Sequence, residues 1–175
     1  MSTRIRLREP TADDIELLDA WDASPEFRGE FNDFGPQPHR SAAERLESGF
    51  ITEMAGTLLV VQLSDNAPVG TVDWRPAMYG PPPESRAFQF GISLAPEARG
   101  KGYGSEALRL CAKYLFENTP ANRVEGSTDV ENTAAQRALE RAGFSFEGTN
   151  RGAQWRRGAY HDLRLYAVLR GELGD

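Results

Sequence analysis

The fold is decided by the stretch Leu94-Ala95-Pro96-Glu97-Ala98-Arg99-Gly100-Lys101-Gly102-Tyr103-Gly104-Ser105-Glu106-Ala107. Pro96 ends an alternating strand, three alternate glycines form a turn, and helical spacing begins at residue 104. Glycine permits positive φ and lets a ligand approach the backbone closely. The amino end of a helix adds unpaired N–H groups and partial positive charge. The stretch therefore predicts a phosphate or diphosphate site, with the cations of Arg99 and Lys101 beside it.

Two common phosphate-binding motifs do not fit this spacing. Dinucleotide folds use G-x-G-x-x-G with an acid about 20 residues further on, whereas the spacing here is G-x-G-x-G without a suitable acid. The triphosphate loop needs G-x-x-x-x-G-K followed by Ser or Thr, but Gly102 follows Lys101 and position 95 is alanine. An ordinary strand-to-helix turn is the structural alternative.

Outward from the turn, hydrophobic periodicity predicts alternating strands and helices. A first strand around Ile5 precedes a helix that starts at Thr11 and a second helix from Ser41 to about Met54. The remaining expected elements are strands at 57–63, 69–74 and 87–94, a loop at 77–85, a helix at 104–117, a strand at 123–130, a helix at 132–143, and strands at 144–148 and 161–169 joined by an arginine-rich hairpin. Both helix crossovers in the second half imply parallel neighbours in a mixed sheet, and the fold class is α/β.

Composition narrows the class of protein. The chain has 175 residues and a formal net charge of −6, which favours one globular domain over residues 1–175 and argues against nucleic acid as a partner. One cysteine excludes an intrachain disulfide, and two histidines with one cysteine make a zinc site improbable, so we expect no metal. Without an apolar run of about 18 residues or a signal peptide, the expected location is cytoplasmic and no membrane partner is expected.

Two motifs at this separation resemble the GCN5-related N-acetyltransferase (GNAT) family. The family's coenzyme A motif, Gln/Arg-x-x-Gly-x-Gly/Ala, is matched by residues 99–104, and its Asn-led helix ending in Gly-Phe is matched by Asn132 through Gly143-Phe144. The resemblance covers nearly the whole chain and implies a twisted mixed sheet of about seven strands with helices on both faces. The run Gly158-Ala159-Tyr160-His161-Asp162 is similar to the RimJ/RimL branch, which acetylates ribosomal-protein N-termini and often forms homodimers.

The resemblance implies that acetyl-CoA binds where strands 88–94 and 123–130 splay. The Ile92 N–H would polarise the acetyl carbonyl, because a fixed donor stabilises charge that develops during the reaction. Ser93 and Leu94 would pair with the pantetheine arm, which Asn132 would also touch, although Asn132 equally suits a helix cap. The main chain would hold the diphosphate at Arg99, Gly100, Lys101, Gly102, Tyr103, Gly104 and Ser105.

The sequence departs from the family pattern at the positions for acid–base chemistry. Gln89 stands where many relatives carry Glu, and Leu139 where they carry Tyr. An α-amine has a pKa of about 7.7–8.0 against about 10.4 for lysine, so a site without a strong base favours an α-amine. We expect direct attack on acetyl-CoA, with a water held by Gln89 or Asp73 relaying the proton and Tyr166 protonating the thiolate. Packing on a sheet face is the alternative role for Asp73 and Tyr166.

The acceptor pocket is expected in the aromatic loop before the second helix. The candidate residues are Glu30, Phe31, Asp33, Phe34 and His39, with Glu30 and Asp33 binding a cation. A protein N-terminus is the first choice of acceptor, and a small amine or aminoglycoside-type antibiotic the second. Two rivals stay open: a non-catalytic acyl-CoA-binding sensor, because the usual acid and base are missing, and a nucleotide-binding regulatory domain.

Overall fold

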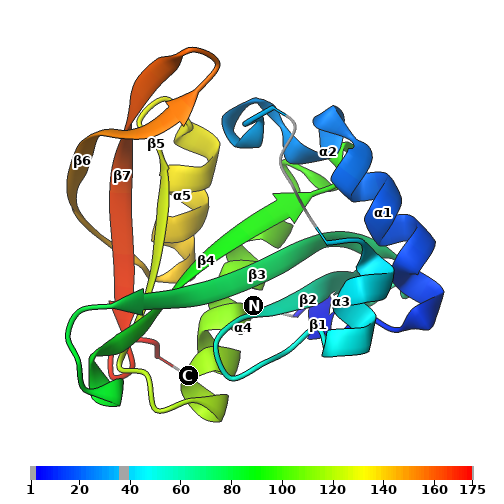
Figure 1. Ribbon diagram of the computed structural model, residues 1–175, viewed down its shortest axis with the longest axis horizontal. Coiled ribbons are helices and arrows are strands. Elements are labelled where there is room, and N and C mark those ends of the chain that lie inside the picture. Colours follow the sequence, from blue (N-terminus) through cyan, green and yellow to red (C-terminus); the bar gives the residue numbers. More distant parts are fainter. Residues whose placement is uncertain (1–2, 36–39, 175) are drawn as a thin grey trace.

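The computed structural model describes residues 3–35 and 40–174, in which seven strands form one mixed sheet of order β1-β2-β3-β4-β5-β7-β6 (Figure 1). Only β4 and β5 run parallel; the other neighbouring strands of this sheet are antiparallel. The strands are β1 (Ile5–Arg8), β2 (Gly56–Gln62), β3 (Pro68–Met78), β4 (Arg86–Leu94), β5 (Arg123–Asp129), β6 (Ser145–Arg156) and β7 (Ala159–Leu169).

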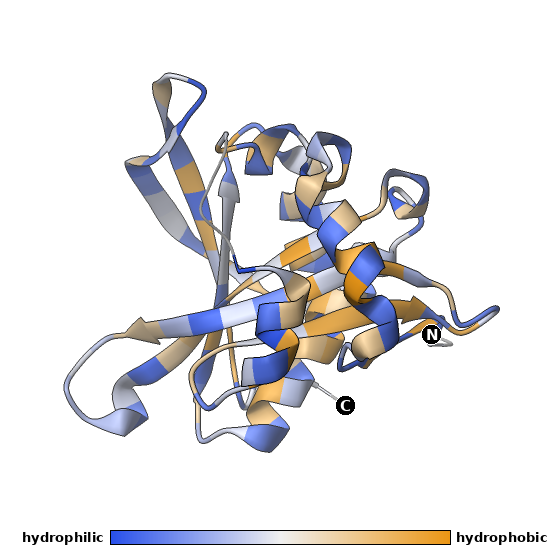
Figure 2. Ribbon diagram, turned by 45° about the vertical axis from the view of Figure 1, so that its right-hand side comes forward, coloured by the Kyte–Doolittle hydropathy of each residue, from blue (hydrophilic) through white to orange (hydrophobic). Residues whose placement is uncertain are grey.

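Helices cover both faces of the sheet (Figure 1). The α-helices are α1 (Ile15–Ala23), α2 (Pro25–Arg28), α3 (Ala42–Ser48), α4 (Tyr103–Asn118) and α5 (Thr133–Ala142). Strand β2 shows why two cores form, because successive side chains point to opposite faces. Leu59 and Val61 pack with Leu18 and Ala42 of α1 and α3, whereas the alternate residues of β2 join the larger cluster beneath α4. Figure 2 shows the apolar residues concentrated in these central strands, with hydrophilic residues at the tip of the β6–β7 hairpin.

The pattern of α4 is confirmed. The apolar stripe Leu108, Cys111 and Leu115 is fully or almost fully buried, at 2% exposure or less. Burial of each leucine contributes about 1.5–3 kcal/mol. Because hydrophobic spacing and a glycine turn are both local signals, the start of this helix was predictable to within one residue.

Four expectations about elements are wrong. The helix from Ser41 ends at Ser48 instead of Met54, because Gly49 takes φ 85° and stops it. Strand β3 runs to Met78, into the expected loop. The second crossover does not give parallel neighbours, because β7 lies between β5 and β6. Strand β6 is longer than expected and runs to Arg156. The sequence did not predict this length because the strand is largely exposed and lacks an alternating apolar pattern.

Strands β4 and β5 separate after a short pairing. Their paired residues are Phe88 with Val124 and Gln89 with Glu125. Beyond this point the Phe90 ring lies against β5 at Gly126, where an added Cβ would come within 3.2 Å of the ring. The absence of a side chain at Gly126 therefore leaves room for Phe90 between the strand and α5. The carboxyl-terminal half of β4 continues toward α2 without β5 alongside it (Figure 1).

Candidate active site

The splayed strands open into a cavity of about 430 Å³, which we call the strand-end groove. It is lined by Phe27, Arg28, Gly29, Glu30, Phe31, Asn32, Ile92, Ser93, Leu94, Arg99 and Asn132. Five of the residues expected to bind the cofactor are therefore together: the three at the end of β4, Arg99 and Asn132. Residues 27–32, from α2 and the turn after it, form the wall facing them.

The glycine turn has the geometry that an anion requires. Gly100 and Gly102 take φ values of 73° and 84°, in the left-handed region that glycine adopts without strain. Gly102 is the N-cap of α4, and no side chain caps the helix there. The first N–H groups of α4 are therefore left for a ligand, as the sequence predicts for a diphosphate.

A carboxylate near this helix end is neutralised by a neighbouring cation. Glu106 in the first turn of α4 accepts a hydrogen bond of 2.7 Å from the Arg4 main-chain N–H and forms a 3.3 Å ion pair with the Arg4 guanidinium. The same guanidinium donates 2.9 Å to the Lys101 carbonyl oxygen. Arg4 thus ties β1 to the turn and reduces the repulsion that Glu106 would exert on an anion.

The Arg99 side chain, which is expected to add positive charge beside the phosphate, is bound to three main-chain carbonyl oxygens. Its guanidinium donates to the carbonyl oxygens of Leu94 at 3.0 Å, Glu26 at 2.6 Å and Phe27 at 2.9 Å. These bonds attach α2 to the end of β4. Arg99 therefore connects the two walls of the groove, which it also lines.

Asn132 has the capping role that the sequence allows. Its Oδ1 accepts a hydrogen bond of 3.1 Å from the Ala135 N–H and so caps α5. Because Asn132 also lines the strand-end groove, its position suits the cap and the predicted cofactor contact together.

Asp73 lies in a second cavity of about 350 Å³, the floor cavity, on the opposite face of β4 from Phe90. The lining residues are Leu18, Trp21, Asp22, Phe27, Arg28, Arg45, Thr57, Thr71, Asp73 and Ser93. Asp73 pairs with Gly91, whose missing side chain leaves the carboxylate open to the cavity. Asp73 is exposed at the cavity surface, but the protein around its carboxylate partly desolvates it and raises the pKa of Asp73, while Arg75 and Arg45 act in the opposite direction.

Gln89 and Tyr166 are not brought into these cavities. The Gln89 Oε1 accepts 3.1 and 2.6 Å hydrogen bonds from Arg75, and its Nε2 donates 3.4 Å to Ser127. Tyr166 is fully buried, its hydroxyl lies 3.4 Å from Glu140, and its ring packs against Phe146. A hydroxyl enclosed in this way has no path to a thiolate in the groove, so the expected acid role of Tyr166 is not supported.

The residues expected to bind the acceptor do not all line one cavity. Glu30 and Phe31 line the strand-end groove. Asp33 pairs with Arg157 at 3.3 Å, and the Gly35 N–H together with Arg157 lowers the pKa of Asp33. Phe34 lines a third cavity of about 390 Å³, the outer cavity. His39 lies outside the described residues.

Arg28 is the site residue that sequence reasoning missed. It lines all three cavities: the strand-end groove, the floor cavity and the outer cavity. It ends α2, a helix of four residues that carries no periodic signal. Trp21 stacks on Phe27 at 4.5 Å between centroids, and both line the floor cavity and pack with the larger core cluster.

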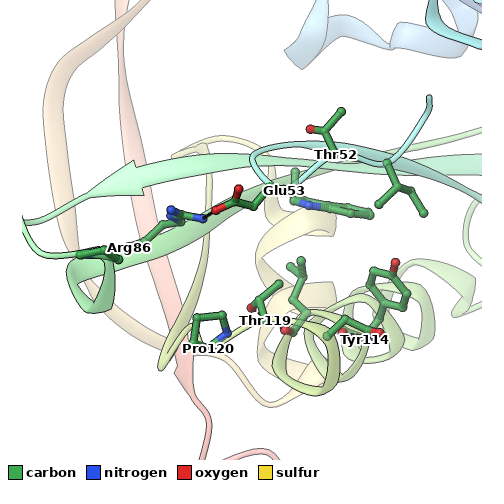
Figure 3. Close-up of a pocket in the computed structure, with 11 residues that line it drawn as sticks. Thr52, Glu53, Arg86, Tyr114, Thr119 and Pro120 are labelled. Atoms are coloured by element: carbon green, nitrogen blue, oxygen red, sulfur yellow. Dashed lines mark hydrogen bonds and ion pairs between the residues drawn. The ribbon is translucent and has the colours of Figure 1, made fainter. Parts of the chain in front are cut away.

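A fourth cavity of about 300 Å³ lies at the other end of β4 (Figure 3). Trp74 and Tyr114 contribute rings 5.5 Å apart, and Glu53 and Arg86 form a 3.2 Å ion pair at its edge. It contains neither the glycine turn nor the splayed strand ends, so it is separate from the candidate site. Within residues 3–35 and 40–174, no cluster of His, Cys, Asp and Glu could hold a metal ion.

Comparison with known proteins agrees with this geometry. Residues 4–145 match the family model described as an acetyltransferase (GNAT) domain. The putative ribosomal N-acetyltransferase YdaF of Bacillus subtilis (strain 168) is 35% identical over 88 residues, which cover 50% of this chain and 48% of that protein. The probable N-acetyltransferase YjcK of the same organism is 33% identical over 106 residues, or 61% and 57% of the two chains. The chain thus spans about half the length of the curated relatives it matches.

Solved structures show the same fold over nearly the whole chain. Spermidine N-acetyltransferase from Vibrio cholerae, in complex with CoA and spermine, superposes with a TM-score of 0.79 at 20% identity, covering 98% of this chain and 99% of that one. RimL, a ribosomal L7/L12 α-N-protein acetyltransferase in complex with CoA, gives 0.78 at 21% identity, covering 96% and 95%. The mixed seven-stranded fold expected from the sequence is confirmed, and the chain belongs to the GNAT acetyltransferase domain family.

Proposed function

We propose that this protein is an acetyl-CoA-dependent N-acetyltransferase of the RimJ/RimL type that acetylates a primary amine. The single observation that carries the proposal is the separation of β4 from β5 directly before the left-handed glycine turn and the uncapped end of α4. Together these features offer an extended strand edge for a pantetheine chain and main-chain donors for a diphosphate. When bound, acetyl-CoA would supply an acetyl group activated as a thioester.

The residues at the end of β4 would orient that thioester. Phe90 to Leu94 have no β5 partner among the described residues, so this edge of β4 is open to an extended chain. We assign Ser93 and Leu94 to pairing with the pantetheine arm and the Ile92 N–H to the acetyl carbonyl oxygen. A donor fixed in a strand stabilises developing negative charge there without having to reorganise. Arg99 to Ser105 would hold the diphosphate through the main chain.

Asp73 is the residue best placed to take the proton that the attacking amine releases. It shares the floor cavity with Ser93, which also lines the strand-end groove, so an amine can lie between the carboxylate and the end of β4. The raised pKa of Asp73 brings it closer to the pKa of an α-amine and makes it a better proton acceptor. Since the Gln89 amide is engaged by Arg75 and Ser127, we favour Asp73 over Gln89 for this role.

A protein N-terminal α-amine is the acceptor we propose first. A relative is named as a ribosomal N-acetyltransferase, and the structural neighbour RimL acts on an α-amine of L7/L12. A small amine is the second candidate, because another neighbour is a spermidine N-acetyltransferase. The homodimer and the cytoplasmic location stay predictions; no helix in the described part of the chain is both long and apolar enough to cross a membrane.

Release of the CoA thiol tests the proposal. Purified protein is incubated with acetyl-CoA and a panel of N-terminal peptides, polyamines and aminoglycosides, and products are identified by mass spectrometry. Amine-dependent thiol release is expected, and D73N should reduce it. Binding of acetyl-CoA without thiol release would instead identify a sensor. Thermal stabilisation by nucleotides but not by CoA would identify a nucleotide-binding domain.

A further inference from the structure

Three arginines surround the space that an acceptor would occupy. Arg28, Arg40 and Arg45 line the outer cavity, and Arg28 and Arg45 also line the floor cavity. The two cavities share Asp22 as well, so they adjoin one another on the α1–α3 side of the sheet. Acceptor and arginines would therefore be in contact if the acceptor extends outward from Asp73.

These arginines have hydrogen-bonding capacity left over. Arg45 forms a 2.6 Å ion pair with Asp22, and Arg28 donates 2.8 Å to the main-chain oxygen of the same residue. Arg40 donates 2.7 Å to the Glu44 carbonyl. Neither Arg28 nor Arg40 has an ion-pair partner in residues 3–35 and 40–174. The Nε atoms of Arg28 and Arg45 also lack a hydrogen-bond partner within the structure described.

The side chains that line the floor and outer cavities carry a net positive charge, whereas the whole chain is negative. The chain carries a formal charge of −6, yet three guanidinium groups face two carboxylates in the floor and outer cavities. Asp22 pairs with Arg45, and neither Asp22 nor Asp73 forms an ion pair with Arg28 within the described residues. A partly buried cation without a partner is unfavourable, and an anionic ligand would relieve that cost.

The expected acidic acceptor residues do not alter this balance. Glu30 lines the strand-end groove and not the outer or floor cavity, and Asp33 forms its ion pair with Arg157, although the charge of Arg28 also helps to lower the pKa of Asp33. A polycation would thus meet few free carboxylates on its way to Asp73. The surroundings suit an acceptor that combines an amine with a negative charge.

We propose that the acceptor is an α-amine that carries a carboxylate, and that Arg28, with Arg40 and Arg45, binds this carboxylate while the amine reaches Asp73. The assignment rests on the proposed function and names its substrate class. A guanidinium binds a carboxylate through two parallel N–H donors, which fixes orientation as well as position. Because Arg28 lines the strand-end groove too, it would align the acceptor with the thioester. The carboxylate can belong to an acidic residue near a peptide N-terminus or to a small amino acid.

The experiment compares acceptors that differ only in charge. Tetrapeptides that begin Ser-Asp-Glu are tested against their Ser-Asn-Gln counterparts, with free glutamate and spermidine as small-molecule arms. We expect kcat/KM to be at least tenfold higher for the acidic peptide than for its amide, mainly through KM. R28Q should bring the ratio close to one, and R40Q should lower it. R6Q, in an exposed arginine of β1 that bonds to Asn66, is the matched control and should keep the ratio.

Each outcome decides the assignment. Equal kcat/KM for acidic and amide peptides in the wild-type protein, or preference for spermidine, would overturn it while leaving the acetyltransferase proposal intact. Thiol release with none of the amines would contradict the proposed function itself. If R28Q does not fold, judged by thermal unfolding, the wild-type peptide comparison and R40Q still decide. Preference for free glutamate over the acidic peptide would support the assignment and identify a small-molecule acceptor.

Discussion

The Arg99 guanidinium donates a 2.9 Å hydrogen bond to the carbonyl oxygen of Phe27, a residue 72 positions earlier in the chain. Phe27 is followed by Arg28, so this bond connects the glycine turn to the residue at which the three cavities meet. The proposed cofactor side and the proposed acceptor side of the site are therefore connected by one side chain. We expect Arg99 to affect activity by positioning α2.

Replacement of Arg99 should affect both substrates together. R99A removes three hydrogen bonds from a charged donor, and we expect the free energy of unfolding to fall by about 1–3 kcal/mol. Because α2 loses its attachment, KM should rise for acetyl-CoA and for the amine alike. Urea unfolding and initial rates measure the two effects. K101A, at an exposed neighbouring position, is the stability control; a change in acetyl-CoA KM alone for R99A would contradict the positioning role.

Alanine should lower the free energy of unfolding at Gly102 but not at Gly104. Gly102 has φ 84°, where a Cβ costs about 1–3 kcal/mol and would lie 3.0 Å from the Arg4 guanidinium. Gly104 lies in the first turn of α4 without left-handed φ, and an added Cβ would lie an ordinary 3.7 Å from the Leu94 side chain. G104A should therefore leave stability unchanged or raise it by up to about 1 kcal/mol.

The affinity for coenzyme A tests whether the glycine turn before α4 binds the diphosphate or is only a strand-to-helix turn. We expect G102A to weaken CoA binding, measured by calorimetry, because the backbone that presents the amino end of α4 changes. G171A, at a position with open space around it and outside the site, is the control for a generic Gly-to-Ala effect. Unchanged CoA affinity in a folded G102A protein would argue against a diphosphate at this turn.

The parts of the site that were predictable from sequence depend on local chemistry. The turn before α4, the alternating faces of β4 and the Asn132 cap each follow from residues within one turn or strand. The partners of Arg99 and the engagement of Gln89 by Arg75 depend on strand register and on residues distant in sequence. No local pattern reports such contacts. Arg28 was missed for the same reason, since it gains its role only where three cavities meet.

Tyr166 provides a test of this distinction, because sequence position suggested catalysis and burial suggests packing. Y166F removes a hydroxyl whose hydrogen bond to Glu140 is 3.4 Å long, so stability should fall by about 1 kcal/mol or less. We expect kcat and its dependence on pH to be unchanged. E140Q, which alters the partner alone, should behave similarly. A large fall in kcat for Y166F, with loss of the alkaline limb, would restore Tyr166 as the thiolate acid.

Replacement of Asp73 should raise the free energy of unfolding at neutral pH while lowering kcat/KM. Desolvation raises its pKa in the folded protein above the unfolded value of about 3.9, so ionisation of Asp73 opposes folding. Below the unfolded pKa the carboxyl is protonated in both states and costs nothing; the cost develops as pH rises through the two pKa values. D73N should therefore be more stable than wild type at pH 7, and the difference should vanish toward pH 3. D13N, at a carboxylate that lines none of the four cavities, is the control and should show no comparable gain.

The activity of D73N should change in the opposite direction to its stability. If Asp73 takes the proton from the amine, its loss should lower kcat/KM by about a hundredfold, the usual lower range for a general base. In wild type, kcat/KM should fall toward acid in two steps, one from protonation of the α-amine near pH 7.7–8.0 and one from Asp73. D73N should keep the first step and lose the second. A variant that gained stability at pH 7 yet kept both steps would show that desolvation of Asp73 serves packing, and that another group or solvent takes the proton.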